Sequence, residues 1–293
     1  MVPAVTGRAS RVVSRRWIGR HRRTLLGAAL VVTVIVSAIG AGWLAPRDPL
    51  AQEILARLQP PGWSDGDGWT ARLGTDHVGR DILSRLLYGG RISLLISLTS
   101  VAGSLAIGLV LGLVAGFYGG SLETLIMRLT DLQLAFPFIL LALAIVALLG
   151  PSLVNIVVVF TVTSRPIYAR VVRGSVLALK QQDFVTAARA LGRAEWGILA
   201  RHVAPNTVAP LTVIAFFEIA RMIITEAALG FLGLGVQPPT ATWGNMLADG
   251  RDYIRDAWWL SAFPGLAIMV MAAGVNLLGD GLRDILDPRH HAS

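Results

Sequence analysis

Four long stretches of this 293-residue sequence contain no Asp, Glu, Lys or Arg: residues 24–46, 92–122, 132–164 and 257–279. A helix needs about 20 consecutive apolar residues to cross the hydrocarbon core of a bilayer. Only a very large soluble domain could bury four such runs, whereas a membrane accommodates each of them as a helix. The pattern therefore predicts an all-α, polytopic membrane protein.

The overall composition points the same way. Hydrophobic residues make up 54% of the chain and charged residues only 15%, against about 25% charged residues in soluble domains. The absence of cysteine excludes disulfides, thiolate metal sites and cysteine nucleophiles. The adjacent His290 and His291 are interpreted as part of a solvated tail. We therefore expect no metal site and no cofactor bound by this chain itself.

The third charge-free run is too long for one helix, and the sequence GPS at 150–152 divides it in two. A further apolar segment, 207–231, contains Glu218, Arg221 and Glu226 but otherwise has the composition of a span. Six transmembrane helices are predicted, near residues 24–45, 92–117, 126–149, 152–173, 207–231 and 257–279.

Basic residues are distributed unevenly among the predicted loops. Residues 1–23 hold seven arginines and no acidic residue, and residues 165–201 hold seven basic and two acidic residues. Residues 46–91 hold six of each. Lys and Arg concentrate in cytoplasmic loops. Residues 1–23, 183–205 and 280–293 are therefore predicted to be cytoplasmic, and residues 46–91 extracytoplasmic.

Small residues recur every four positions in the second predicted helix. Ser104, Gly108, Gly112 and Gly116 belong to this series and lie along one stripe of the helix. Small side chains at this spacing let two helix backbones approach closely in lipid. The stripe predicts close packing against another helix of this chain or of a partner subunit.

The chain lacks the residues of a nucleotide-hydrolysing enzyme. Its one lysine, Lys180, lies in LALKQQ, whereas a P-loop requires a Gly-rich loop followed by Lys and Ser or Thr. Neither a G-x-S-x-G nucleophile motif nor an H-E-x-x-H zinc motif is present. We therefore expect no catalytic residues here, and transport would have to be driven by a gradient or by a partner.

A polar, basic stretch, residues 183–206, reads DFVTAARALGRAEWGILARHVAPN. Apolar residues at helical spacing predict two short helices joined at Gly192, the second ending at Pro205. The apolar positions are Phe184, Ala187, Ala188, Leu191, Trp196, Leu199 and Val203. The residues leave two interpretations open: a helix lying on anionic headgroups, or a docking element for a groove on a soluble partner.

Polar residues also occur inside the predicted spans. Glu218 and Arg221 are three residues apart and can pair on one helical face. Arg165 falls in the cytoplasmic half of its span, where it can snorkel, and Asn276 lies in the last span. Such residues usually face a bundle interior or a water-filled cavity. They are interpreted either as internal structural contacts or as weak polar contacts along a conduit.

Charges are frequent just before the second predicted helix as well. Asp76, Arg80, Asp81 and Arg85 fall within residues 60–91. We expect these residues to fix the extracytoplasmic segment through ion pairs, with contact to a partner protein as the second interpretation.

Four motifs, in this order, resemble the C-type subunit of the dipeptide/oligopeptide/nickel permease family of binding-protein-dependent ABC importers. They are LGTDHVGRDILSRLLYGGRISLL (73–95), TAARALG with RHVAPN (186–206), ITEAALGFLGLGVQPPTATWGNML (224–247) and NLLGDGLRDILDPR (276–289). The second is similar to the EAA loop of such permeases. The resemblance implies the type I ABC importer permease fold, with six transmembrane helices and a cytoplasmic two-part coupling helix.

The resemblance also implies partners and a place in the cell. A homologous second permease would complete the pore, and two cytoplasmic ATPase subunits would bind ATP and Mg and dock on the EAA loop. An extracytoplasmic binding protein would deliver the substrate, and no nucleic acid is involved. The location would be the plasma membrane of a prokaryote. A peptide is the implied substrate, with nickel or another small solute as the alternative.

By the same resemblance, the ATPase-coupling residues are Thr186, Ala187, Ala188, Gly192, Trp196, His202 and Pro205. The family motif opens with glutamate where this chain has Thr186, so an ion pair through that position cannot be carried over. Two rival hypotheses are a gradient-driven secondary transporter, which usually shows internal repeats, and a membrane scaffold that does not transport.

Overall fold

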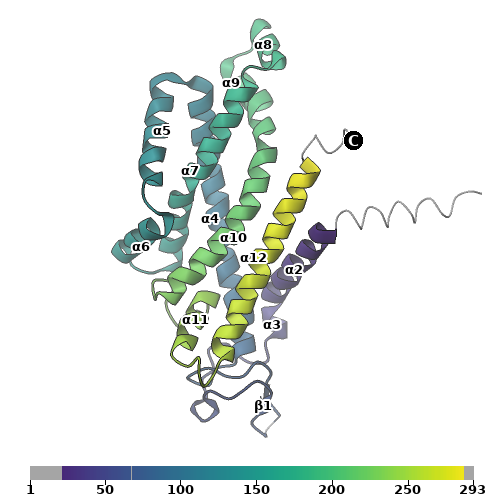
Figure 1. Cartoon of the computed structure of the whole chain (residues 1–293), viewed down its shortest axis with the longest axis vertical. Coiled ribbons are helices and arrows are strands. Elements are labelled where there is room, and N and C mark those ends of the chain that lie inside the picture. Colours follow the sequence, from purple (N-terminus) through teal and green to yellow (C-terminus); the bar gives the residue numbers. More distant parts are fainter. Residues whose placement is uncertain (1–21, 67, 287–293) are drawn as a thin grey trace, which may run out of the picture.

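The computed structural model of the chain describes residues 22–66 and 68–286 and is almost entirely helical, as predicted (Figure 1). Residues 1–21 and 287–293, which include His290, His291 and most of the predicted cytoplasmic ends, lie outside the described residues. The α-helices are α2 (Arg22–Ile39), α3 (Ala41–Leu44), α4 (Ile82–Tyr118), α5 (Gly120–Leu134), α6 (Phe138–Leu149), α7 (Leu153–Leu179), α8 (Asp183–Ala190), α9 (Glu195–Ile198), α10 (Val208–Phe231), α11 (Trp243–Arg251) and α12 (Trp259–Leu286). Shorter elements are the turns η1 (Ile54–Ala56), η2 (Leu199–Val203) and η3 (Ala204–Thr207) and an antiparallel pair of strands, β1 (Trp63–Ser64) and β2 (Thr70–Ala71).

The helix bundle has two distinct ends (Figure 1). α8 and α9 project from one, which we call the elbow end. α11 and the β1–β2 hairpin lie at the other, the loop end. The first residues of α2 and the last residues of α12 are both directed toward the elbow end of the bundle.

The predicted count of six spans is not confirmed. By length and composition, α2, α4 and α12 could each cross a membrane. Two bent pairs, α5 with α6 and residues Glu195–Thr207 with Pro210–Phe231, raise the number to at most five among the described residues. α7 is 27 residues long but carries three arginines, which lower its mean hydropathy. The prediction of a membrane protein is supported by α2, α4 and α12, which are long and apolar enough to cross a membrane.

Several helices extend beyond the predicted limits. α4 begins at Ile82 rather than near residue 92, because the Asp81 carboxylate accepts a hydrogen bond from the Ser84 N–H (2.7 Å) and caps the helix. α12 continues to Leu286, so the predicted tail 280–293 begins as helix. At 37 residues, α4 is about 55 Å long. It therefore exceeds the hydrocarbon core of about 30 Å.

The helix predicted near 126–149 is wrong as a single element. The structure divides it into α5 and α6, whose axes differ by 88°. The break is at Pro137, whose ring disfavours helical backbone in Phe136 and leaves position 137 without an N–H. The charge-free run concealed this break because apolar composition alone does not distinguish a straight helix from two helices at an angle.

The centre of the bundle is a close, parallel contact between α4 and α7. The small-residue stripe of α4 faces α7, and a Cβ built on Gly112 would lie 2.6 Å from the Ala169 carbonyl oxygen. The Ser104 hydroxyl donates to the Thr161 carbonyl (3.0 Å). At the elbow end the Lys180 Nζ donates to the Phe117 carbonyl (2.6 Å). From Gly103 to Gly116 the two backbones are so close that only small side chains fit on this stripe.

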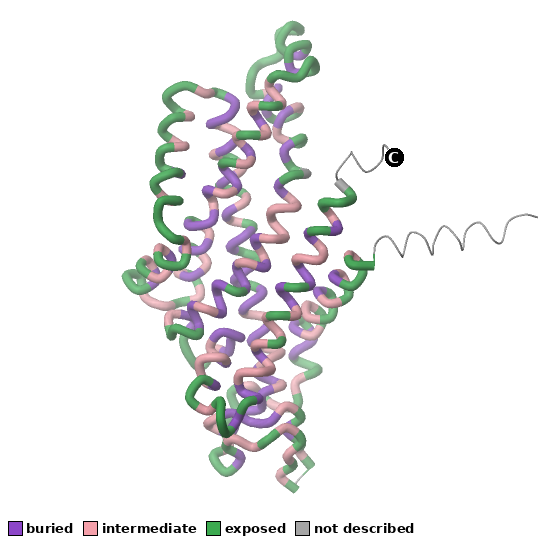
Figure 2. The backbone as a smooth tube through the Cα atoms, in the orientation of Figure 1, coloured by how far each residue is buried: buried purple, intermediate pink, exposed green. Residues whose placement is uncertain are grey.

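The remaining helices cover this central pair. α12 packs against α2 and α10, and a Cβ on Gly27 would lie 2.8 Å from the Gly274 carbonyl oxygen, so α2 and α12 also meet backbone to backbone. Figure 2 shows α4 and α7 lined with buried residues, whereas α5 is exposed along most of its length. α5 therefore stands at the edge of the bundle and contributes little to its core.

Gly112→Ala should destabilise the protein, because the added methyl group requires α4 and α7 to separate. Overpacking of this kind costs about 1–3 kcal/mol. The matched control is Gly174→Ala in α7, where an added Cβ meets nothing within 4 Å and the better helix propensity should stabilise by up to about 1 kcal/mol. Denaturant titration in detergent, followed by tryptophan fluorescence, measures both changes. Equal stability of the two variants would contradict the close contact.

Candidate functional site

The elbow consists of α8, a tight turn and α9 at one end of the bundle (Figure 1). Gly192 occupies the left-handed region with φ of +76°, which glycine adopts without steric cost. The Gly192 N–H donates to the Arg189 carbonyl and the Arg193 N–H to the Ala188 carbonyl, at 3.0 and 3.2 Å. These bonds close the carbonyl end of α8 and let the chain reverse into α9.

The elbow has two apolar faces rather than the single face that the spacing predicted. Val185, Ala188, Ile198, Leu199 and Val203 are buried against the bundle. A second set projects away from it: Phe184, Leu191 and Trp196 are 42%, 85% and 67% exposed. Large apolar side chains exposed at the tip of a protruding element are typical of a protein contact.

An ion pair crosses the turn of the elbow. The Arg189 guanidinium donates to both carboxylate oxygens of Glu195, at 2.8 and 3.2 Å. These hydrogen bonds lower the pKa of Glu195 below its usual value. Because both side chains are exposed, the pair contributes little to stability. The pair links α8 to the first residue of α9.

The other predicted elbow residues have different surroundings. Thr186 and Ala187 are exposed, whereas the ring of His202 lies 6.4 Å from that of Phe184. Pro205 does not end the helical path as predicted, because the chain passes through η2 and η3 into α10. The result is a bend of 53°, with the proline in the first turn of η3, where its missing N–H costs nothing.

The predicted intramembrane charges meet near the break between α5 and α6. Arg221 donates to the Glu218 carboxylate (2.5 and 3.1 Å) and to the Ser164 hydroxyl (3.3 Å). Its guanidinium lies 4.3 Å from the centre of the Phe138 ring. The Arg165 Nε donates to the Gln133 side-chain oxygen (3.3 Å).

Asn276 lies apart from this cluster. It is half-buried on α12, and no described hydrogen bond joins it to the residues around Arg221. Of the four predicted conduit residues, Glu218 and Arg221 therefore form a pair, and Arg165 contacts α5 beside the same helix break.

Glu226 is a further buried charge, which was not selected among the predicted site residues. It is 1% exposed, and its Oε2 accepts from the Ser93 hydroxyl (2.9 Å). The same hydroxyl accepts from the Trp243 N–H (3.3 Å). α4, α10 and α11 are thus joined at one point. The feature of the sequence that could have identified Glu226 is a carboxylate inside an otherwise apolar span.

At the loop end, Asp76 is fully buried between two arginines. Its carboxylate accepts from Arg80 at 2.6 Å and also from Arg85. Both guanidiniums reach Asp249 of α11, at 3.4 and 3.0 Å. Burial by itself would raise the pKa of Asp76, but the guanidiniums and two backbone N–H groups outweigh it and lower that pKa below 3.8.

Asp76, His77 and Asp249 are close enough to one another to hold a metal ion. Both carboxylates, however, are already engaged by arginines, and a cation would have to displace them. The arrangement is therefore an ion-pair network that fixes the loop end, in keeping with the predicted role of Asp76, Arg80 and Arg85. Asp81 serves instead as the cap of α4.

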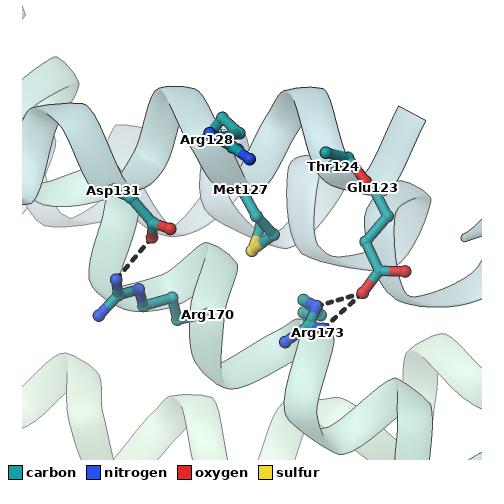
Figure 3. Close-up of a pocket in the computed structure, with 7 residues that line it drawn as sticks. All are labelled: Glu123, Thr124, Met127, Arg128, Asp131, Arg170 and Arg173. Carbon is teal, nitrogen blue, oxygen red and sulfur yellow. Dashed lines mark hydrogen bonds and ion pairs between the residues drawn. The ribbon is translucent and has the colours of Figure 1, made fainter. Parts of the chain in front are cut away.

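Figure 3 shows a groove of about 630 Å³ between α5 and α7. Two ion pairs bridge it: Asp131 with Arg170 (2.6 Å) and Glu123 with Arg173 (2.5 Å). The Arg128 side chain also lines the groove. These pairs attach the exposed α5 to the bundle in place of an apolar contact.

A helical bundle that is apolar enough for a membrane, with an exposed elbow at one end, is the architecture of a membrane transport subunit. The comparisons with known proteins identify the family. Residues 108–291 match the family model described as "Binding-protein-dependent transport system inner membrane component". The chain belongs to this family.

Relatives match almost the whole chain. It is 49% identical over 270 residues to the "Di/tripeptide transport system permease protein DppC" of Pseudomonas aeruginosa, covering 92% of this chain and 89% of the relative. It is 46% identical to the "Dipeptide transport system permease protein DppC" of Escherichia coli, with 92% and 90% covered. Its fold resembles an inward-facing structure of the MetNI methionine ABC transporter, with a TM-score of 0.57 at 19% identity, over 69% of this chain and 96% of that one.

Asp76→Asn should destabilise the protein at pH 7, because both arginines lose their buried partner. Breaking such a pair costs about 3–5 kcal/mol. A carboxyl with a lowered folded-state pKa stabilises the fold above its ordinary pKa, and this contribution is lost as the pH falls through the folded-state value. The wild type should therefore lose more stability than the variant between about pH 5 and pH 3.

Thermal unfolding in detergent, followed by tryptophan fluorescence, measures this difference. Asp252→Asn is the control, because Asp252 is exposed and paired only with its neighbour Arg251. If Asp76→Asn changes stability no more than the control does, at pH 7 and between pH 5 and pH 3, the ion-pair network does not fix the loop end.

Proposed function

We propose that the chain is the permease subunit of an ATP-driven ABC importer that takes up dipeptides or oligopeptides. The observation that carries this proposal is the identity of 49% and 46% to two curated peptide permeases, each over 92% of the chain. The apolar spans and the absence of a P-loop lysine agree with a subunit that conducts the substrate but leaves ATP hydrolysis to partners.

The elbow is the proposed docking site for a cytoplasmic ATPase subunit. Its buried face anchors it to α7 and α10, and its exposed face presents Phe184, Leu191 and Trp196 to a groove on the partner. Thr186, Ala187, Ala188, Gly192, Trp196, His202 and Pro205 belong to this coupling segment. Because Thr186 carries no charge, we infer that the ATPase holds the elbow by apolar contact.

ATP-driven movement would reach the pore through the elbow. The turn at Gly192 and the Arg189–Glu195 pair connect α8 to α9. The helical path then continues through η2 and η3 into α10, which carries Glu218 and Arg221. A displacement of the elbow therefore moves α10 relative to α4 and α7, which is a hinge-type change in access to the pore.

The proposed assembly has four kinds of chain. A homologous second permease completes the pore, two ATPase subunits bind ATP and Mg, and an extracytoplasmic binding protein delivers the peptide to the loop end. The basic elbow and both chain ends would face the cytoplasm of a prokaryote. The lipid bilayer contacts the remaining apolar surface.

Reconstitution of the complete complex in liposomes tests the function directly. ATP inside the vesicles and loaded binding protein outside should drive uptake of radiolabelled Ala-Ala, and a proton gradient alone should not. Uptake by the isolated chain under a proton gradient would instead favour a secondary transporter. Uptake of nickel but not of Ala-Ala would identify the other substrate class in this family.

Leu191→Asp should release the ATPase subunits, because it places a charge in the centre of the exposed elbow face. Leu191 is 85% exposed, so the fold itself should be unaffected. Leu55→Asp is the matched control, because Leu55 is 92% exposed at the loop end. Co-purification of ATPase subunits with each tagged variant is the measurement. Equal recovery with both variants would show that the elbow is not the docking site.

A further inference from the structure

Two arginines flank the break between α5 and α6 inside the apolar part of the bundle. The Arg165 guanidinium is bonded to Gln133, four residues before the break at Pro137. The Arg221 guanidinium covers the ring of Phe138, directly after it. Arg221 is also bonded to Ser164, the neighbour of Arg165. Both guanidiniums therefore contact residues beside the same helix break, and we treat them as one candidate site.

The position of this site along the bundle follows from its contact with α4. The Arg165 backbone is beside Gly108 of α4, where an added Cβ would lie 2.8 Å from the Arg165 carbonyl oxygen. Gly108 is 16 residues after the start of the charge-free run at Ile92 and ten before the end of α4 at Tyr118. At 1.5 Å per residue these separations are about 24 and 15 Å. The Arg165 backbone is therefore nearer the elbow end of α4, and the exposed Asp131–Arg170 pair lies five residues further along α7.

The charges of the site do not balance. Glu218 is paired with Arg221, which donates two hydrogen bonds to one carboxylate oxygen, Oε2. Within residues 22–66 and 68–286, no Asp or Glu forms an ion pair with Arg165. The site therefore carries one excess positive charge. A charge at this depth costs several kcal/mol unless it is paired or faces water, so the site needs an anion from outside this chain.

The two arginines are accessible to a ligand. Arg221 is 34% exposed and Arg165 is half-buried on the isolated chain, so both reach the surface of the bundle. One turn along α7, the hydroxyl of Tyr168 is buried and has no hydrogen-bond partner among the described residues. Guanidinium groups bind carboxylates with two parallel hydrogen bonds.

We propose that Arg165 binds the carboxylate of the peptide in transit, assisted by Arg221, on a face of α7 and α10 that lines the conduit. This inference rests on the proposed function and adds to it a substrate contact inside the membrane. The carboxylate of a peptide supplies a negative partner for the Arg165 guanidinium, which has none among the described residues.

The absence of cysteine from the chain allows a direct test. Arg165→Cys introduces one thiol, which is modified in the reconstituted complex, with cysteine-free partner subunits, by methanethiosulfonate reagents. ATP-driven uptake of Ala-Ala should fall by about tenfold or more in the unmodified variant, since a charge-assisted contact is lost. The cationic aminoethyl reagent should restore most of it, whereas the neutral methyl and anionic sulfonatoethyl reagents should not.

Two controls accompany this experiment. The wild-type chain treated with each reagent should keep its full uptake. Val32→Cys, 56% exposed on α2, places a thiol on an apolar outer face and should not react, because these reagents need water. Excess Ala-Ala should slow modification of the Arg165→Cys thiol, and that protection by substrate is not expected from a merely structural arginine.

The alternatives give different results, and each would overturn the proposal. Normal uptake by Arg165→Cys, an unreactive thiol, or equal rescue by the neutral reagent would exclude a charge contact in an aqueous conduit. Loss of the second permease from the purified complex would show that Arg165 pairs with an acidic residue of that subunit. If the wild-type complex takes up no Ala-Ala with ATP, the proposed function fails first and this inference fails with it.

Discussion

The close contact between α4 and α7 is the interaction on which the rest of the structure depends. It brings two backbones together along a stripe of serine and glycine, so neither helix can rotate without a clash. Lipid provides no hydrophobic force between helices, and packing of this kind has to replace it. Because α7 is fixed in this way, the depth of Arg165 and the position of the elbow that follows α7 are fixed as well.

The sequence indicated the class, the family resemblance and the elements of the elbow, because each depends on local pattern or composition. The four-residue spacing of small residues in α4 can be read from the sequence, but the helix that packs against them cannot. The break at Pro137 was missed because the prediction followed the charge-free composition, although a proline inside such a run is itself a signal for the end or kink of a helix. The bond between Arg165 and Gln133 joins residues 32 positions apart, and no local pattern predicts such a contact.

The elbow shows how neighbouring apolar residues can serve opposite purposes. Val185 is buried while Phe184 is exposed, although they are adjacent in the sequence. Helical spacing identified Phe184 but not Val185, and it could not say which face would meet the bundle. The difference matters for function, because the buried set holds the elbow to α7 and α10 and the exposed set remains for another protein. Substitutions in the two sets should therefore separate stability from assembly.

The length of α4 has a mechanical consequence. This helix runs 37 residues without interruption, from the Asp81 cap beside the ion-pair network at the loop end to the Lys180–Phe117 contact beside the elbow. A continuous helix behaves as a stiff rod, since bending it requires a proline, a bulge or an inserted side chain. If α4 tilts at the loop end, its other end beside the elbow must therefore move as well, because the helix has no break at which it could bend.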